Sequence, residues 1–139
     1  MSYDMIAYCT RCWREVKSED KVCPGCEADL TLDHRTYEEK LLGALAHPLP
    51  EARVRICWLI GENQIRHAVP DLISLAEEDP DLFVRKAALE SLGTLGDPRS
   101  VAILRTISLG ENRFLAEAAK KSLGTFMPQA KSSVRETHS

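Results

Sequence analysis

The fold of this chain is decided by residues 81–93, which read Asp-Leu-Phe-Val-Arg-Lys-Ala-Ala-Leu-Glu-Ser-Leu-Gly. The pattern returns thirty-one residues later without a gap. Six residues of the later copy are identical to their counterparts, namely Phe114, Ala118, Ala119, Ser122, Leu123 and Gly124. An earlier copy starts at Pro50, thirty residues before Pro80, and carries Val54-Arg55 where the second copy carries Val84-Arg85. A period of about thirty residues predicts a repeat protein.

A second apolar segment separates successive copies. Its apolar positions are Val69, Leu72 and Leu75 after the first copy, Val101, Leu104 and Ile107 after the second, and Leu42 and Leu45 before the first. Two helices per unit are typical of an α-solenoid, in which each pair buries its apolar face on its neighbours. The predicted helices lie near 36–46, 51–61, 66–78, 81–94, 98–109 and 112–126.

Proline, aspartate and glycine mark the expected ends of these helices. Pro50, Pro80 and Pro98 fit first turns, and an N-capping aspartate, Asp79 or Asp97, stands just before two of them. Four glycines stand at the expected C-terminal ends, namely Gly93, Gly96, Gly110 and Gly124.

The middle copy resembles the HEAT-like repeats of the phycobilisome-lyase type, whose pattern is Val-Arg, a small residue, Leu-Gly and then Gly-Asp-Pro. The matching residues are Val84-Arg85, Ala88, Ser91-Leu92-Gly93 and Leu95-Gly96-Asp97-Pro98. The resemblance covers about residues 36–127 and implies an all-α fold, a short HEAT-like α-solenoid. Such repeats mostly present a surface to a partner, and a subset carry chromophore-lyase or alkylated-base glycosylase activity. The fold alone therefore leaves the function open.

Four of the five cysteines stand near the N-terminus in two pairs, Cys9-Thr10-Arg11-Cys12 and Cys23-Pro24-Gly25-Cys26. Two C-x-x-C turns supply the four sulfur ligands of a closed structural site. We therefore expect one structural Zn²⁺ per chain, bound by Cys9, Cys12, Cys23 and Cys26, with iron in the same site as the main rival. Disulfides would need an oxidising compartment, and the first residues show no secretory signal. A thioredoxin-like redox pair would need a βαβ pattern, which the sequence lacks.

This segment resembles the short zinc ribbons of bacterial proteins, in which Cys-x-x-Cys-Gly is followed by Cys-Pro-x-Cys-Gly and a closing leucine. The second half of that pattern is matched by Cys23, Pro24, Cys26 and Leu30. Trp13 and Glu27 stand where the ribbons have glycine, so a positive φ there would strain each turn. The resemblance implies a structural or adaptor module with a small β fold, and some such ribbons contact nucleic acid.

The sequence divides into a zinc ribbon at 1–33, a HEAT-like repeat domain at 34–128 and a flexible C-terminal tail at 129–139. The 139 residues carry a formal net charge of −3, and no apolar run is long enough to span a membrane. We therefore expect a cytoplasmic protein. Residues 1–33 hold four basic against seven acidic residues, whereas nucleic-acid modules normally show a basic patch. Nucleic acid is thus not the expected partner.

One large residue of the first copy stands out. In the thirty-residue alignment, Trp58 occupies the position of Ala88 and Ala119. A stacked interior has no room for that exchange unless the first repeat is open on one side. Only two residues separate the ribbon from the first helix, so we expect the ribbon to cover Trp58, with Trp13 supplying apolar area. The alternative is that Trp58 covers that end by itself.

Arg55 and Arg85 could bind a phosphate or carboxylate group of a ligand, because the guanidinium of arginine offers a rigid bidentate fork. We expect instead a structural ladder, in which they pair with the capping acids Asp81 or Asp97.

The C-terminal end of the repeats is expected to be incomplete, because the third copy has a first helix and no second. Phe126 and Met127 would then be left for a protein partner or a second copy of the chain, which makes a homo-oligomer possible. The alternative is that they fold back on Phe114.

These features predict a non-enzymatic interaction module that binds a protein partner. The candidate contacts, on the second helices, are Asp71, Ser74, Arg99, Arg105 and Thr106. The alternative is a lyase-type enzyme or accessory subunit, and a third reading is nucleic-acid binding through the ribbon. Cys57 is the one candidate nucleophile, but it aligns with alanines of the sister copies, so we expect a buried, inert thiol.

Overall fold

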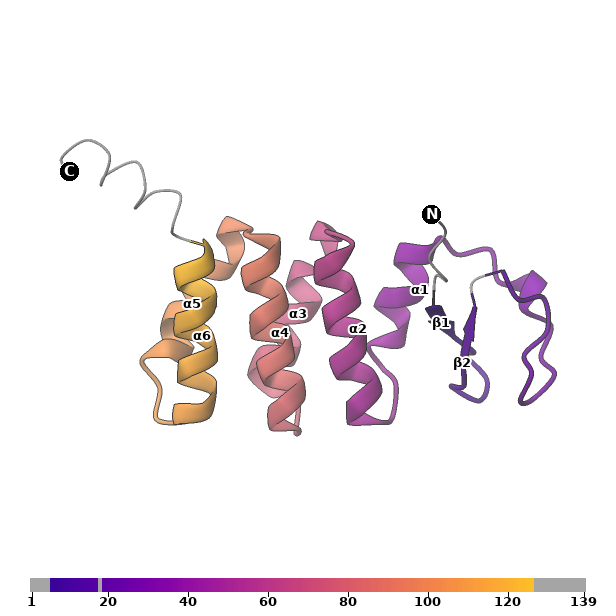
Figure 1. Cartoon of the computed structure of the whole chain (residues 1–139), viewed down its shortest axis with the longest axis horizontal. Coiled ribbons are helices and arrows are strands. Elements are labelled where there is room, and N and C mark those ends of the chain that lie inside the picture. Colours follow the sequence, from indigo (N-terminus) through magenta and orange to yellow (C-terminus); the bar gives the residue numbers. More distant parts are fainter. Residues whose placement is uncertain (1–5, 18, 127–139) are drawn as a thin grey trace.

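The computed structural model describes residues 6–17 and 19–126 (Figure 1). One antiparallel hairpin joins strands β1 (Ile6–Tyr8) and β2 (Glu15–Lys17). The helices that follow are α1 (Tyr37–Ala44), α2 (Pro50–Glu62), α3 (Val69–Glu78), α4 (Leu82–Leu95), α5 (Val101–Ser108) and α6 (Arg113–Phe126). Short 3-10 turns are η1 (Leu30–Leu32), η2 (Arg66–Ala68) and η3 (Pro98–Ser100).

The predicted fold class is confirmed, because the described chain is mostly helical with one small sheet near its start. When η2 and η3 are counted with α3 and α5, every helix end lies within two residues of its predicted position. None of the described helices is long and apolar enough to cross a membrane. The predicted tail at 129–139, Met127 and the side chain of Phe126 lie outside what the structure describes.

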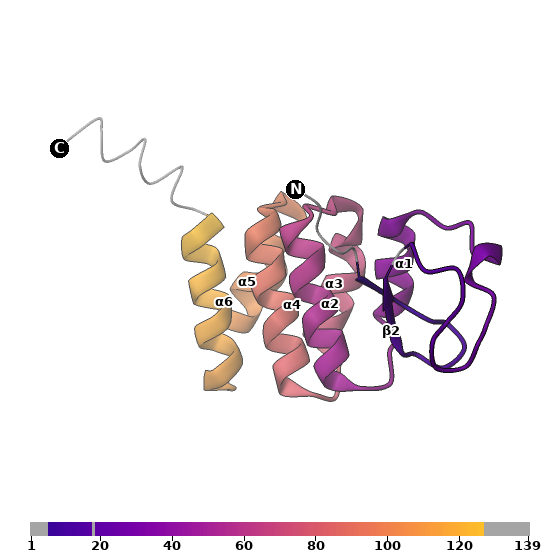
Figure 2. The same ribbon diagram turned by 45° about the vertical axis from the view of Figure 1, so that its right-hand side comes forward.

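The helices form two layers (Figures 1 and 2). Helices α2, α4 and α6 stand side by side and form the first layer, and α1, α3 and α5 form the second layer. Each helix of the second layer packs on the helix that follows it, α1 on α2, α3 on α4 and α5 on α6. The described chain therefore contains three helical hairpins. Helix α6 pairs with α5, the helix before it, and the structure describes no helix after it.

The helix starts show how the copies correspond in space. Helix α2 begins at Pro50, α4 at Leu82 and α6 at Arg113, so the spacings are thirty-two and thirty-one residues. The buried residues of α2 follow the same spacing, with Ile56, Cys57, Ile60 and Gly61 matching Ala88, Leu89, Leu92 and Gly93. The thirty-residue alignment of Pro50 with Pro80 is thus two residues too short. Trp58 corresponds to exposed Glu90, and not to buried Ala88.

Close contacts between small residues set the distance between neighbouring helices of the first layer. Ser91 of α4 lies against Gly61 of α2, and Ser122 of α6 lies against Gly93 of α4. A Cβ atom added at Gly93 would come within 2.7 Å of the Ser122 Cβ. Gly93 and Gly124 lie in the last turns of α4 and α6, two residues before each helix ends.

The glycine that ends α4 is Gly96, at φ 62°, a left-handed conformation that glycine adopts without strain. Asp97 caps η3 as predicted, since its carboxylate accepts from the backbone N–H of Arg99 at 2.8 Å. Helix α4 is capped by Asp81, however, and not by Asp79. Asp79 is buried instead.

An arginine ladder exists, but at the thirty-two-residue spacing of Arg53 and Arg85. The guanidinium of Arg53 binds the Asp79 carboxylate at 2.9 and 3.1 Å and donates to the backbone oxygen of His47 at 2.8 Å. Arg85 donates through Nε to the backbone oxygen of Ala76 at 2.9 Å. Arg53 thus ties α2 to the end of α3 and to the loop after α1, and Arg85 ties α4 to α3. The predicted pairing of Arg55 and Arg85 with Asp81 or Asp97 is wrong.

Candidate metal centre

The two C-x-x-C turns have the same backbone shape. In each turn, the residue after the second cysteine donates its N–H to the carbonyl of the first cysteine, Trp13 to Cys9 at 2.8 Å and Glu27 to Cys23 at 2.9 Å. Trp13 and Glu27 both have φ 65°. The positive φ that the ribbon resemblance implied at these positions is confirmed. A side chain in this conformation costs about 1 kcal/mol, so something else must hold the turns in place.

Four sulfur atoms converge between these turns. The Sγ atoms of Cys9, Cys12, Cys23 and Cys26 all lie within 4.8 Å of one another. Two of the separations, Cys9 to Cys26 and Cys12 to Cys23, are 3.6 Å. A tetrahedral metal with sulfur at about 2.3 Å requires sulfur atoms about 3.8 Å apart. All four cysteines are free thiols. The geometry therefore fits one four-sulfur metal site, formed by the predicted residues.

Backbone N–H groups and burial act on these thiols in opposite directions. The N–H of Cys26 has the largest effect on the Cys23 thiol, and together with the N–H of Gly25 it lowers the pKa of Cys23 to about 6. The N–H of Ala28 lowers the pKa of Cys26, but burial and the neighbouring sulfur atoms outweigh it and raise that pKa to about 11. Four thiols this close do not all ionise unless a cation compensates their charge.

The metal centre lies in a very small apolar core. Its buried residues are Ala7, Cys9, Val16 and Cys23, with Cys26, Ala28 and Leu30 packed against them. Cys9 and Cys23 are fully buried, whereas Cys12 is exposed. A core of this size does not hold a fold by itself, so a bound metal would supply much of the stability of this segment.

The part of the chain before α1 that holds the four cysteines, residues 6–17 and 19–33, is called the cysteine segment. It packs on the first helical hairpin, α1 and α2, through His47. The rings of Tyr8 and Trp13 lie 5.0 and 5.2 Å from the His47 ring. The N–H of Leu49 donates to His47 Nδ1 at 3.1 Å, so the ring proton is on Nε2 and is donated to the Trp13 carbonyl at 2.9 Å. His47 is thus a neutral, buried link between the loop after α1 and a residue next to the metal centre.

This contact was predicted in part. Trp13 takes part in it as expected, and Tyr8 belongs to the same apolar core as Leu41 of α1. Trp58 does not, because its side chain is 60% exposed. The prediction that the ribbon covers Trp58 is therefore wrong. The alternative that Trp58 covers the N-terminal end of the repeats by itself is wrong too, because Trp58 lines a cavity with residues of α4. His47 was missed because nothing in the spacing of the four histidines points to it.

A second contact joins the same two parts of the chain. The guanidinium of Arg55 on α2 forms an ion pair with the carboxylate of Glu15 on β2. Both side chains are 45% exposed, so this pair contributes at most about 1 kcal/mol. Its main consequence is that the charge of Arg55 is balanced by the cysteine segment.

The helical part matches the family of HEAT repeats over residues 38–124. This match covers more than half of the chain. The chain belongs to the HEAT-repeat family. The match does not extend over the four cysteines. Comparison with curated proteins finds no match to the sequence.

The HEAT repeats bury the fifth cysteine, as predicted. Cys57 lies in the middle of α2 with no exposed surface, and burial raises the pKa of its thiol to about 12. No ring or amino group donates to its sulfur among the described contacts.

The predicted partner-contacting residues lie on the second layer of the HEAT repeats. Asp71 and Ser74 are on α3, Arg105 and Thr106 on α5, and Arg99 in η3. All five are exposed. Arg99 binds Asp97 at 3.0 Å and so is already paired. They remain candidates, spread over two hairpins.

Proposed function

We propose that this HEAT-repeat protein is a non-enzymatic protein-interaction module, in which one structural Zn²⁺ holds the cysteine segment against the first hairpin. The observation that carries the proposal is the exposure of large apolar side chains on the first layer. Trp58 of α2 is 60% exposed and Phe83 of α4 is 64% exposed. They line adjoining cavities between the same two helices. Exposed apolar surface of this kind is typical of a partner-binding site.

Zinc is the metal that best fits four thiolates in a closed tetrahedron. Four protein ligands leave no open position for water or substrate, which favours a structural role over a catalytic one. Thiolate ligands persist in a reducing compartment, so we propose a cytoplasmic location. Elemental analysis of the purified protein is expected to give one zinc per chain. A coloured preparation with one iron per chain would show that the metal is iron and not zinc, with the same four cysteine ligands.

Interaction is tested by affinity capture with the metal-loaded protein as bait. Matched baits would carry Trp58→Ala on the first layer or Arg105→Ala on the second, because both side chains are exposed and neither change should disturb folding. The proposal would be supported by a protein that the wild-type bait retains and one of these variants does not. The variant that loses it would show which layer binds the partner. If the intact protein retains nothing beyond what a denatured bait retains, the proposed function is wrong.

A further inference from the structure

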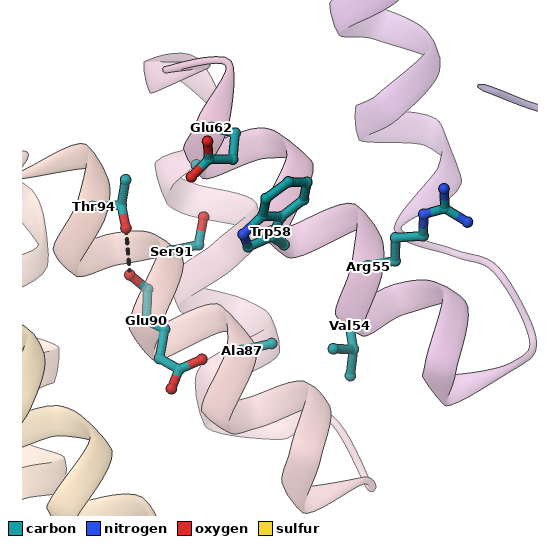
Figure 3. A pocket seen from close by; sticks show the side chains of 9 residues that line it. Val54, Arg55, Trp58, Glu62, Ala87, Glu90, Ser91 and Thr94 are labelled. Carbon is teal, nitrogen blue, oxygen red and sulfur yellow. Dashed lines mark hydrogen bonds between the residues drawn. The ribbon is translucent and has the colours of Figure 1, made fainter. Parts of the chain in front are cut away.

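Two adjoining cavities lie between α2 and α4. One cavity of about 320 Å³ is lined by Val54, Arg55, Trp58, Gly61, Glu62, Ala87, Glu90, Ser91 and Thr94 (Figure 3). A second cavity of about 360 Å³ is lined by Pro50, Glu51, Val54, Asp81 and Phe83. The two share Val54, so together they form one surface, which we call the α2–α4 groove. Trp58 stands in one half of it and Phe83 in the other.

The α2–α4 groove is acidic. Its lining includes four carboxylates, those of Glu51, Glu62, Asp81 and Glu90, and one guanidinium, that of Arg55. Arg55 is directed away from Trp58 and is paired with Glu15 (Figure 3). Lys86 lies 3.5 Å from Glu90 but lines the neighbouring cavity between α4 and α6. A cationic ligand is therefore favoured here over an anionic one.

A buried hydroxyl in the wall of the groove lacks a partner. Ser91 is 4% exposed, and its Oγ makes no hydrogen bond. Its repeat counterpart Ser122 is satisfied, because its hydroxyl donates to the Leu89 carbonyl at 2.8 Å. The small residues that bring the helices together are the same in both places, Gly61 against Ser91 and Gly93 against Ser122. The serine hydroxyl is therefore unpaired at the contact of α2 with α4 and paired at the contact of α4 with α6. An unpaired polar group of this kind indicates a place where a polar ligand group would be stabilised.

We propose that the α2–α4 groove binds a basic segment of a partner protein, with an arginine stacked on Trp58 and an apolar side chain in the half lined by Val54 and Phe83. A guanidinium stacks on an indole ring more favourably than on any other side chain and pairs with carboxylates such as Glu62 and Glu90. The guanidinium would thus lie in the half of the groove that Ser91 also lines. This inference rests on the proposed interaction function and names the chemistry of the partner.

The test uses the full, metal-loaded protein and a library of random dodecapeptides. Selected peptides are made synthetically with a fluorescein label, and their dissociation constants are measured by fluorescence anisotropy. We expect the selected peptides to contain arginine close to an apolar residue. Trp58→Ala should weaken binding by about tenfold or more, as for an aromatic anchor in a binding site. The double variant Glu62→Gln and Glu90→Gln should weaken it and reduce its dependence on salt.

Matched controls separate the groove from the rest of the surface. Leu109→Ala removes an exposed apolar side chain at the end of α5 and should leave peptide binding unchanged. Arg105→Ala removes an exposed cation of the second layer, outside the groove, and should also leave peptide binding unchanged. Thermal unfolding of each variant is expected to match the wild type, because the altered side chains are exposed.

The inference is overturned if the selected peptides lack basic residues, or if Trp58→Ala and the double glutamine variant bind them as the wild type does. It is also overturned if the wild type dimerises and Trp58→Ala is monomeric, since the groove would then belong to a second copy of the chain. If affinity capture yields a partner that Trp58→Ala still retains, the interaction function stands and only the groove assignment fails.

Discussion

Two glycines at equivalent positions of α4 and α6 allow a matched test of the helix packing. Gly93 and Gly124 are thirty-one residues apart, which is the spacing of the two helices. A Cβ added at Gly93 would lie 2.7, 2.8 and 3.0 Å from Cβ, Oγ and Cα of Ser122, whereas a Cβ at Gly124 would have no atom within 4 Å. The same substitution therefore has opposite consequences at the two sites.

For Gly93→Ala, carbon atoms prefer a separation of about 3.5–4.0 Å, so α6 must move away from α4 by roughly 1 Å. Overpacking of this kind costs about 1–3 kcal/mol. The movement would also weaken the bond from Ser122 to the Leu89 carbonyl, at about 1 kcal/mol, while the better helix propensity of alanine returns up to about 1 kcal/mol. We expect a net destabilisation of about 1–3 kcal/mol.

For Gly124→Ala only the propensity gain remains, at most about 1 kcal/mol and less in the last turn of a helix. Urea unfolding of the metal-loaded variants, followed by far-ultraviolet circular dichroism, measures both changes. The two variants should differ by about 1–4 kcal/mol, given the terms above. If Gly93→Ala is as stable as Gly124→Ala, the close approach of α4 and α6 is not as described.

Four further predictions concern the cysteine segment and single side chains. Removal of the metal by a chelator should unfold the cysteine segment and leave most of the helical signal, because the HEAT repeats bury their own core. Loss of all helical signal would contradict this. His47→Ala should speed metal release to a coloured chelator, since it removes the bonds to Trp13 and Leu49, and an unchanged rate would show that His47 does not anchor the cysteine segment. Thiol reagents should label Cys57 only when denaturant opens the fold, so fast labelling of the native protein would refute its burial. Hydrogen bonds from Arg99 lower the pKa of Asp97 to about 2, below its value in an unfolded chain. The pair therefore stabilises the fold above about pH 4, and this stability is lost as the pH falls through about 2. The melting temperature of Asp97→Asn should depend less on pH in that range than the melting temperature of the wild type.

The four cysteines of the candidate metal centre and the shape of their two turns could be predicted from local sequence. A C-x-x-C turn places both of its sulfur atoms on one side of a single backbone reversal, and Trp13 and Glu27 had to adopt positive φ because they close those turns. The helices were equally local, since repeated apolar positions and capping residues fixed their number and their ends to within two residues. What a residue does within its own turn or helix depends on neighbours a few positions away, and these are visible in the sequence.

Contacts between elements were decided only by the tertiary structure. The alignment of Pro50 with Pro80 matched these prolines and the Val-Arg pair of each copy. The helices pack instead by the thirty-two-residue spacing, at which Gly61 corresponds to Gly93. Two residues turn a helix by about 200°, so this small difference moved Trp58 from the interior to the groove. The same shift made Arg53, and not Arg55, the partner of Asp79. His47 likewise acquired its role from Trp13 and Leu49, because a side chain that joins two elements has no periodic signal of its own.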